Sequence, residues 1–168
     1  TIGGARPELA WTALHRTISH QLKYSLPTCR YTEEECKHIM APAMTTGLQR
    51  SGISKNFPVA ARHAPTESGG LHVIDLFIEM GTARTQALLS HSIQKTPTSH
   101  LLLANVEQLV LEAGLYGPIW EAPITSLQKW CASDTWIFHT LKFNASHQIQ
   151  LNITHQHLQP ARENDQSL

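Results

Sequence analysis

Cysteine, charge and long apolar runs are all scarce in this sequence of 168 residues. The three cysteines, Cys29, Cys36 and Cys131, cannot all pair, which argues against a disulfide framework and favours a reducing, intracellular location in the cytoplasm or nucleus. No apolar stretch approaches the roughly 18 residues that cross a bilayer, so we expect no membrane partner. No apolar signal core opens the sequence, and we therefore interpret the sequons at Asn144 and Asn152 as chance.

Local catalytic signatures are also missing. The sequence contains no Gly-x-Ser-x-Gly, no phosphate-binding Gly-x-x-x-x-Gly-Lys and no Asp-Asp pair. Its eleven histidines raise the question of a metal site, with Cys29, Cys36 and His38 as one group and His155 and His157 as another. Structural zinc sites usually need four ligands in pairs two to four residues apart, and Cys29 to Cys36 is too wide and has no second pair. We therefore predict no catalytic residue, no metal, no cofactor and no small-molecule substrate for this chain alone.

The charges that are present balance overall but not along the chain. Thirteen basic residues match thirteen acidic ones. Residues 1–62 carry eight Lys and Arg against four acids, whereas residues 63–168 carry five against nine. The basic excess over residues 1–62 is a hint of a polyanionic partner. The simpler interpretation is that these residues form an ordinary solvated surface.

Apolar spacing predicts a mainly α-helical protein. Apolar residues make up 41% of the chain, which is enough for a folded core. Thr32 and Glu35 form a capping-box signal, and we expect Pro42 to kink the helix that follows or divide it in two. Asp75 and Asp134 stand where N-caps are expected, and Gly114 where a C-cap is. The predicted helices cover about residues 7–24, 33–48, 76–94, 98–113, 126–132 and 134–143.

Strand signals are few. Residues 148–154 alternate with period two, which predicts a short β segment near the C-terminus. Phe57, Val59, Leu71 and Val73 are weaker strand candidates in a stretch that is otherwise irregular. We expect helical bundle-like modules in this order: a basic module at 1–62, a Gly/Pro-containing connector at 63–74, a second helical module ending in the strand at 75–157, and a polar tail at 158–168.

Three stretches together resemble the region after the polymerase core in retroelement reverse transcriptases. The first is a helix with Trp11, Leu14 and Leu22 that leads into Cys-Lys-His-Ile-Met-Ala-Pro at 36–42. The second stretch comprises Gly47-Leu48, Gly52-Ile53, Phe57-Pro58 and residues 61–65. The third comprises residues 69–71 and 75–77, Glu79, and residues 101–114 and 162–165. The resemblance implies a thumb- or connection-like region, and that the chain is a piece of a longer RNA-directed DNA polymerase.

The resemblance implies a non-catalytic role, because the catalytic aspartates of this family lie in the upstream palm. The implied partners are the palm and fingers of the same polypeptide and the template–primer duplex. The chain would contact the phosphate backbone of this duplex without sequence preference. A small helical protein–protein interaction module, with Trp120, Trp130 and Trp136 at the contact, is the alternative, and an independent metal-dependent enzyme is a distant third. The predicted nucleic-acid contacts are Lys23, Arg30, Lys37, Arg50, Lys55 and Arg62.

Overall fold

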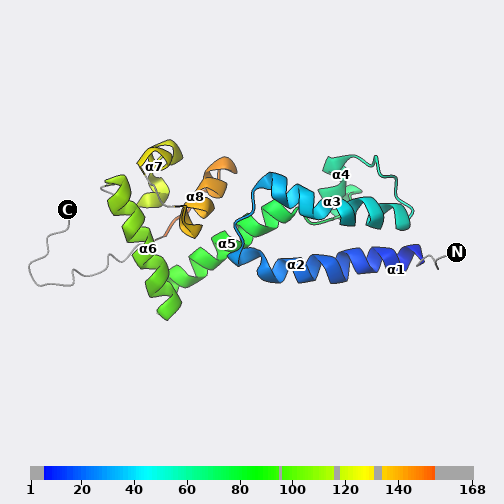
Figure 1. The fold of residues 1–168 in the computed structure, drawn as a ribbon, viewed down its shortest axis with the longest axis horizontal. Coiled ribbons are helices and arrows are strands. Elements are labelled where there is room, and N and C mark those ends of the chain that lie inside the picture. The colour runs from blue at the N-terminus through cyan, green and yellow to red at the C-terminus, as the bar shows by residue number, and fades with distance from the viewer. Residues whose placement is uncertain (1–5, 95, 116–117, 131–133, 154–168) are drawn as a thin grey trace, which may run out of the picture. The chain divides into compact units, whose positions relative to one another are not determined.

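A computed structural model describes residues 6–94, 96–115, 118–130 and 134–153, which form helices joined by turns (Figure 1). The prediction of a mainly α-helical protein is confirmed. The chain divides into two compact units, Thr1–Ala83 and Arg84–Leu168. This division falls inside helix α5 (Leu76–Ile93), and residues 63–74 belong to the first unit instead of linking two modules.

The first unit opens with three helical segments that follow one another without a break. These are α1 (Pro7–Thr12), the π-helical η1 (Ala13–Ile18) and α2 (Ser19–Ser25). The Ser19 hydroxyl donates to the Leu14 carbonyl at 2.9 Å across the wider π turn. The short 3₁₀ segment η2 (Leu26–Thr28) contains Pro27, and the chain is extended from Cys29, as proline near a helix end predicts.

Helix α3 (Glu33–Arg50) begins with the predicted capping box. The Glu35 N–H donates to Thr32 Oγ1 at 3.2 Å, and the Thr32 N–H donates to Glu35 Oε2 at 2.7 Å. The helix continues through Pro42, so the expected division into two helices is wrong. Pro42 is exposed, and we attribute its tolerance to solvent that reaches the carbonyl left without a helical donor.

The helices of the first unit pack around a small apolar core. Helix α1 contacts α3, and the Leu14 side chain lies 3.3 Å from the position of a Cβ on Gly47. A Cβ at position 47 would therefore require the Leu14 side chain on η1 to shift by a few tenths of an ångström. The core between α2, α3 and the first turns of α5 consists of Leu26, Cys36, Met40, Leu76 and Met80.

The stretch between α3 and α5 holds helices where short strands were expected. Val59 starts helix α4 (Val59–His63), and η3 (Thr66–Ser68) follows it. The Leu71 and Val73 N–H groups donate to the carbonyls of Ala61 and Arg62 at 2.9 and 2.8 Å. These bonds satisfy the extended backbone against the end of a helix, so no sheet forms here and the strand prediction for this stretch is wrong.

Helix caps delimit the later helices. Asp75 caps α5 as predicted, since its Oδ1 accepts from the Phe77 and Ile78 N–H groups at 3.0 and 3.2 Å. Helix α6 (Pro97–Ala113) ends at Gly114 in the left-handed conformation, φ 62°, which confirms the predicted C-cap. Helix α7 spans Ile124–Trp130, after the 3₁₀ turn η4 (Ile119–Glu121).

Helix α8 (Trp136–Ser146) corrects one predicted cap. Thr135, not Asp134, is its N-cap, because Thr135 Oγ1 accepts from the Phe138 N–H at 3.2 Å. The Asp134 carboxylate instead pairs with Nε2 of His139, one turn inside the helix. Thr and Asp are both good N-caps, and sequence alone does not choose between neighbours.

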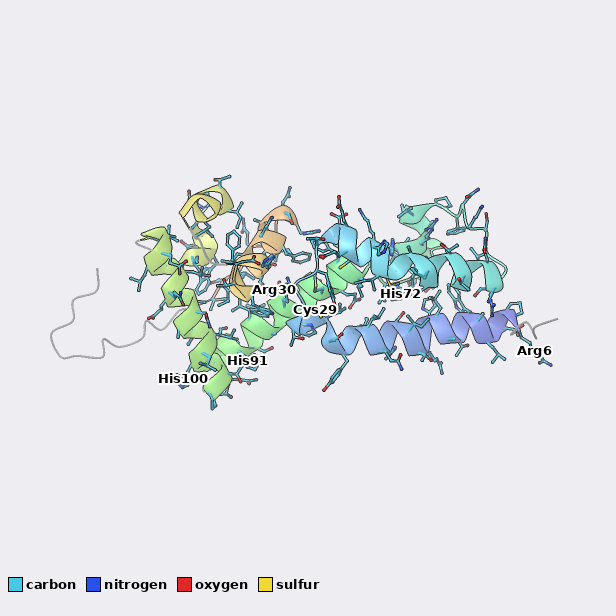
Figure 2. All side chains as sticks on the ribbon, in the orientation of Figure 1. Arg6, Cys29, Arg30, His72, His91 and His100 are labelled. Atoms are coloured by element: carbon cyan, nitrogen blue, oxygen red, sulfur yellow. The ribbon has the colours of Figure 1, made fainter. Side chains whose placement is uncertain are left out.

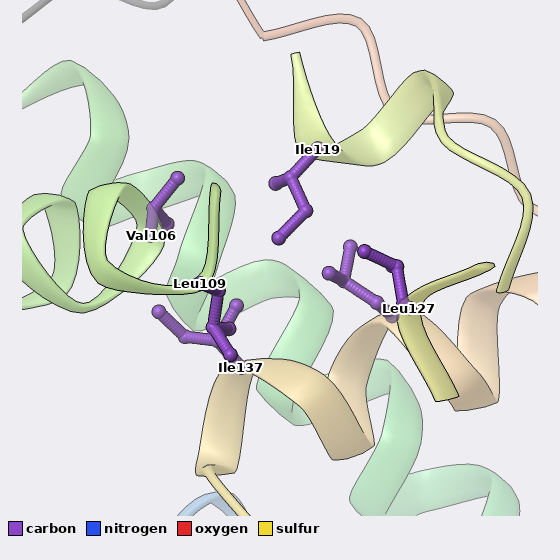
Figure 3. Packing of buried hydrophobic residues seen from close by; sticks show 6 residues of the cluster. Val106, Leu109, Ile119, Leu127 and Ile137 are labelled. Atoms are coloured by element: carbon purple, nitrogen blue, oxygen red, sulfur yellow. The ribbon is translucent and has the colours of Figure 1, made fainter. Parts of the chain in front are cut away.

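The core of the second unit lies between α6, η4, α7 and α8 (Figure 3). Its buried members are Val106, Leu109, Ile119, Leu127, Ile137 and Leu141. The expected strand is not present among residues 148–153, and Thr154 lies outside the described residues. Gln148 adopts φ 56° in a turn at the end of α8, and residues 149–153 after it have no regular secondary structure.

Candidate nucleic-acid interface

The six predicted phosphate contacts all lie in the first unit, but at least two of them are paired with acids. Lys23 Nζ on α2 lies 3.0 Å from Glu79 Oε2 on α5. Lys37 Nζ lies 2.5 Å from Glu33 Oε1, one turn earlier on α3. The hydrogen bond with Glu33 raises the pKa of Lys37 above its ordinary value. An internal acid thus offsets the positive charge of each of these lysines.

Arg30 stands apart from the cations near the chain start. It is exposed and precedes α3, after the long helical run has ended. Figure 2 shows Arg30 far along the first unit from Arg6, which precedes α1 at the opposite end of that run. Arg30 and Arg6 therefore do not contact the same phosphate.

The remaining three predicted residues gather around the loop between α3 and α4. Arg50 is the last residue of α3 and is exposed, and Lys55 is exposed in the loop. The half-buried Arg62 guanidinium donates from Nε to the Phe57 carbonyl at 2.8 Å and from Nη2 to the Lys55 carbonyl at 2.9 Å. Arg62 therefore holds the loop on which Lys55 is displayed.

Arg6 is a fourth cation at this end, and the predicted site did not include it. It is exposed and immediately precedes α1, which packs against α3. Figure 1 shows the start of α1 at the same end of the first unit as the close of α3. We call Arg6, Arg50, Lys55 and Arg62 the basic end; Glu8 is an acid near it, on α1.

A sequence signal marks most of the basic end. Residues 36–66 contain four Lys and Arg and no Asp or Glu, the longest basic stretch free of acids in the first unit. Counted by structural unit, the first unit has eight basic and seven acidic residues, and the second has five and six. The excess over residues 1–62 is thus largely cancelled within the first unit by Glu67, Asp75 and Glu79. Glu33, Glu34 and Glu35 lie at the other end of α3 from Arg50.

The tryptophans of the alternative interpretation have structural roles. Trp120 and Trp136 are half-buried and pack against the core of the second unit. The Trp130 side chain lies outside the described residues. Large apolar side chains are instead exposed elsewhere, with Tyr24 at 92%, Ile93 at 84%, Leu111 at 68% and Leu101 at 67% exposure.

Besides Lys37, whose pKa is raised, His15 and Glu35 of the first unit have pKa values that their surroundings lower. Burial, and next the nearby His72, lower the pKa of His15 below 6.5. The His15 ring packs on Trp11 with centroids 4.2 Å apart. Hydrogen bonds from the Thr32 backbone and hydroxyl lower the pKa of Glu35. Both groups belong to helix packing or capping, and neither lies at the basic end.

Metal-ligating side chains do not cluster in the described parts of the chain, where no group of three His, Cys, Asp or Glu could hold an ion. Among the described residues Cys29 and Cys36 form no disulfide, and Cys29 Sγ donates to the Ser25 carbonyl at 3.1 Å. His155 and His157 lie outside the described residues. Over the described ranges, no helix combines the length and apolarity that crossing a bilayer requires.

Comparison with known proteins identifies no relative. No protein-family model matches the chain, and neither the curated proteins nor the solved structures contain a match.

Proposed function

We propose that this chain is a non-catalytic accessory region that contacts the phosphate backbone of a template–primer duplex through its basic end. The observation that carries the proposal is the position of Arg50 and Lys55. Both are exposed and flank one loop, and that loop is held in place by Arg62. Cations displayed in this way neutralise phosphates and carry no sequence information. Lys23 and Lys37, which are paired internally, have a smaller part in this proposal.

The resemblance to the thumb and connection regions of retroelement reverse transcriptases supports the same role. In that setting the chain acts inside the cell next to an upstream polymerase palm, which supplies the RNA-directed DNA polymerase chemistry. The chain itself positions the duplex. The net charge of zero predicts weak binding by the isolated chain, so its contribution depends on the neighbouring polymerase.

The test measures fluorescence anisotropy of a labelled RNA–DNA primer–template duplex against the full 168-residue chain. We expect micromolar binding at 50 mM salt that weakens steeply as salt rises. Arg50→Glu should weaken binding by about tenfold and reduce the salt slope by about one, as loss of a phosphate contact does. The matched control is Lys142→Glu, an exposed cation on α8 with the same change in charge.

Two results contradict the proposal. If Arg50→Glu and Lys142→Glu weaken binding equally, net charge alone explains the affinity and the basic end has no special role. If the unmodified chain does not bind the duplex at 50 mM salt, the nucleic-acid role fails.

A protein–protein interaction module is the second candidate. The apolar side chains that this function would use are Leu101 and Leu111 on α6, which are both exposed. Under this function the Leu101→Ser and Leu111→Ser variants lose association with a protein partner, and duplex binding is absent in all variants.

A further inference from the structure

An open groove of about 510 Å³ lies on the surface of the first unit, where α3 begins. Side chains three or four residues apart share one face of a helix, so a single short stretch of sequence lines the groove. Its exposed lining is mostly apolar, and its two large apolar side chains, Tyr31 and Ile39, are 40% and 37% exposed. The lining residues are Tyr31, Glu34, Glu35, His38 and Ile39.

Carboxylates give this groove a negative rim. The Glu35 carboxylate accepts from the Thr32 N–H and hydroxyl, and these hydrogen bonds lower its pKa and keep it ionised at neutral pH. The exposed Glu34 side chain has no hydrogen bond or ion pair within the described residues, so its charge is available to a partner. Neither Arg30 nor Lys37 lines the groove. A complementary partner therefore presents a cation next to an apolar side chain.

The basic end of the same unit presents this combination. Val59 is 62% exposed at the start of α4, four residues after the exposed Lys55. The hydrogen bonds from Arg62 to the carbonyls of Lys55 and Phe57 hold the stretch between them in place. A surface that is ordered before binding loses less conformational freedom when a partner docks. The basic end is thus complementary to the groove in charge and in its apolar side chain.

A chain cannot bring these two surfaces of its own together. Glu34 and Arg50 are sixteen residues apart on the continuous helix α3, which at 1.5 Å per residue separates them by about 24 Å. The surface that fits the groove therefore comes from another molecule. We propose that the basic end of one copy of this chain docks into the groove of a second copy. Val59 would pack on Tyr31 and Ile39, and Lys55 would pair with Glu34.

The contact joins two different surfaces, so the copies associate head to tail. A dimer leaves one groove and one basic end unoccupied, and further copies can add to it. Both surfaces are small and exposed, so we expect weak association that high salt suppresses. The proposal does not rest on the nucleic-acid role, although a bound duplex would compete for the basic end.

Sedimentation velocity of the full 168-residue chain, without nucleic acid, tests the proposal. We expect the average sedimentation coefficient to rise with protein concentration at about 50 mM salt and to rise much less at about 500 mM. Glu34→Lys alters the groove and Lys55→Glu alters the basic end, and each should weaken association by about tenfold or more. The matched controls Glu121→Lys and Lys142→Glu change charge equally at exposed positions of the second unit and should associate as the unmodified chain does.

Mixing the two variants gives the decisive result. Neither Glu34→Lys nor Lys55→Glu should associate alone, but an equimolar mixture should, because an intact basic end then meets an intact groove. In the duplex-binding assay Glu34→Lys should bind at least as well as the unmodified chain, so failure of self-association and failure of the nucleic-acid role are distinguishable. An unmodified chain that stays monomeric at millimolar concentration overturns the proposal. So does a Glu34→Lys variant that still associates, or a mixture that does not.

Discussion

The guanidinium of Arg62 donates to the main-chain carbonyl of Lys55 at 2.9 Å, so one cation of the basic end shapes the loop that displays another. The same guanidinium also reaches the Phe57 carbonyl. Arg62 is therefore both a charge and a structural brace, and its two roles can be separated by experiment.

Replacing Arg62 should cost stability in a way that replacing Arg50 does not. Arg62→Ala leaves two carbonyl oxygens without their donor, and we expect the free energy of unfolding to fall by about 1–2 kcal/mol. Arg50→Ala removes an exposed side chain and should change it by less than about 0.5 kcal/mol. Urea unfolding followed by circular dichroism measures both. Equal losses would show that the brace has no energetic role.

The neighbouring glycines Gly69 and Gly70 should respond differently to alanine. Gly69 has φ 76° with open space around it, so Gly69→Ala meets only backbone strain of about 1 kcal/mol. A Cβ on Gly70 would lie 2.1 Å from the Ala64 carbonyl oxygen, a clash with backbone, and we expect a loss of about 3 kcal/mol. Thermal unfolding ranks the two variants. The idea fails if Gly70→Ala is no more destabilising than Gly69→Ala.

The buried hydrogen bond between Thr85 and Asn144 should behave as a coupled pair. Thr85→Val removes the donor and leaves the Asn144 Oδ1 buried without it, at an expected cost of about 1–3 kcal/mol. In the double variant Thr85→Val with Asn144→Leu, both polar partners are gone, and part of the cost should be recovered. A double-mutant cycle from urea unfolding gives the coupling energy. Simple additivity would show that the two side chains do not interact.

His15 should make the stability of the first unit depend on pH. Its pKa in the folded state is below the ordinary value of 6.5 because burial disfavours the imidazolium. The unfolded state therefore binds more protons below this pH, and stability, complete above about pH 6.5, declines as the pH falls further.

The measurement compares the unmodified chain with His15→Gln from pH 5 to pH 8. The difference between their free energies of unfolding should be constant at high pH and shift in favour of the variant below about pH 6.5. Histidines that do not interact with His15 titrate alike in both proteins and cancel in this difference, so the remaining pH dependence belongs to His15 together with its interaction with His72. A pH-independent difference would assign the low-pH instability to another group.

Helix ends could be predicted from the sequence wherever a single capping residue determines them. The capping box of Thr32 and Glu35, the Asp75 cap and the Gly114 cap all follow from short-range hydrogen bonding and backbone preference. Predictions failed where neighbours of similar propensity competed, as Thr135 did with Asp134, or where solvent relieved a local penalty, as at Pro42. The candidate site was predicted least well, since six cations were grouped by their closeness in the chain.

By itself the sequence determined the longer helices and several of their ends, because caps, proline positions and apolar periodicity act within one or two turns. Only the tertiary structure decided which cations are paired with distant acids, since Lys23 meets its acid on a helix more than fifty residues away. The tertiary structure also decided whether the alternating segment after α8 forms a strand. Alternation with period two is compatible with a strand, but a strand also needs a partner strand, and in this structure residues 148–153 have none beside them and form no strand.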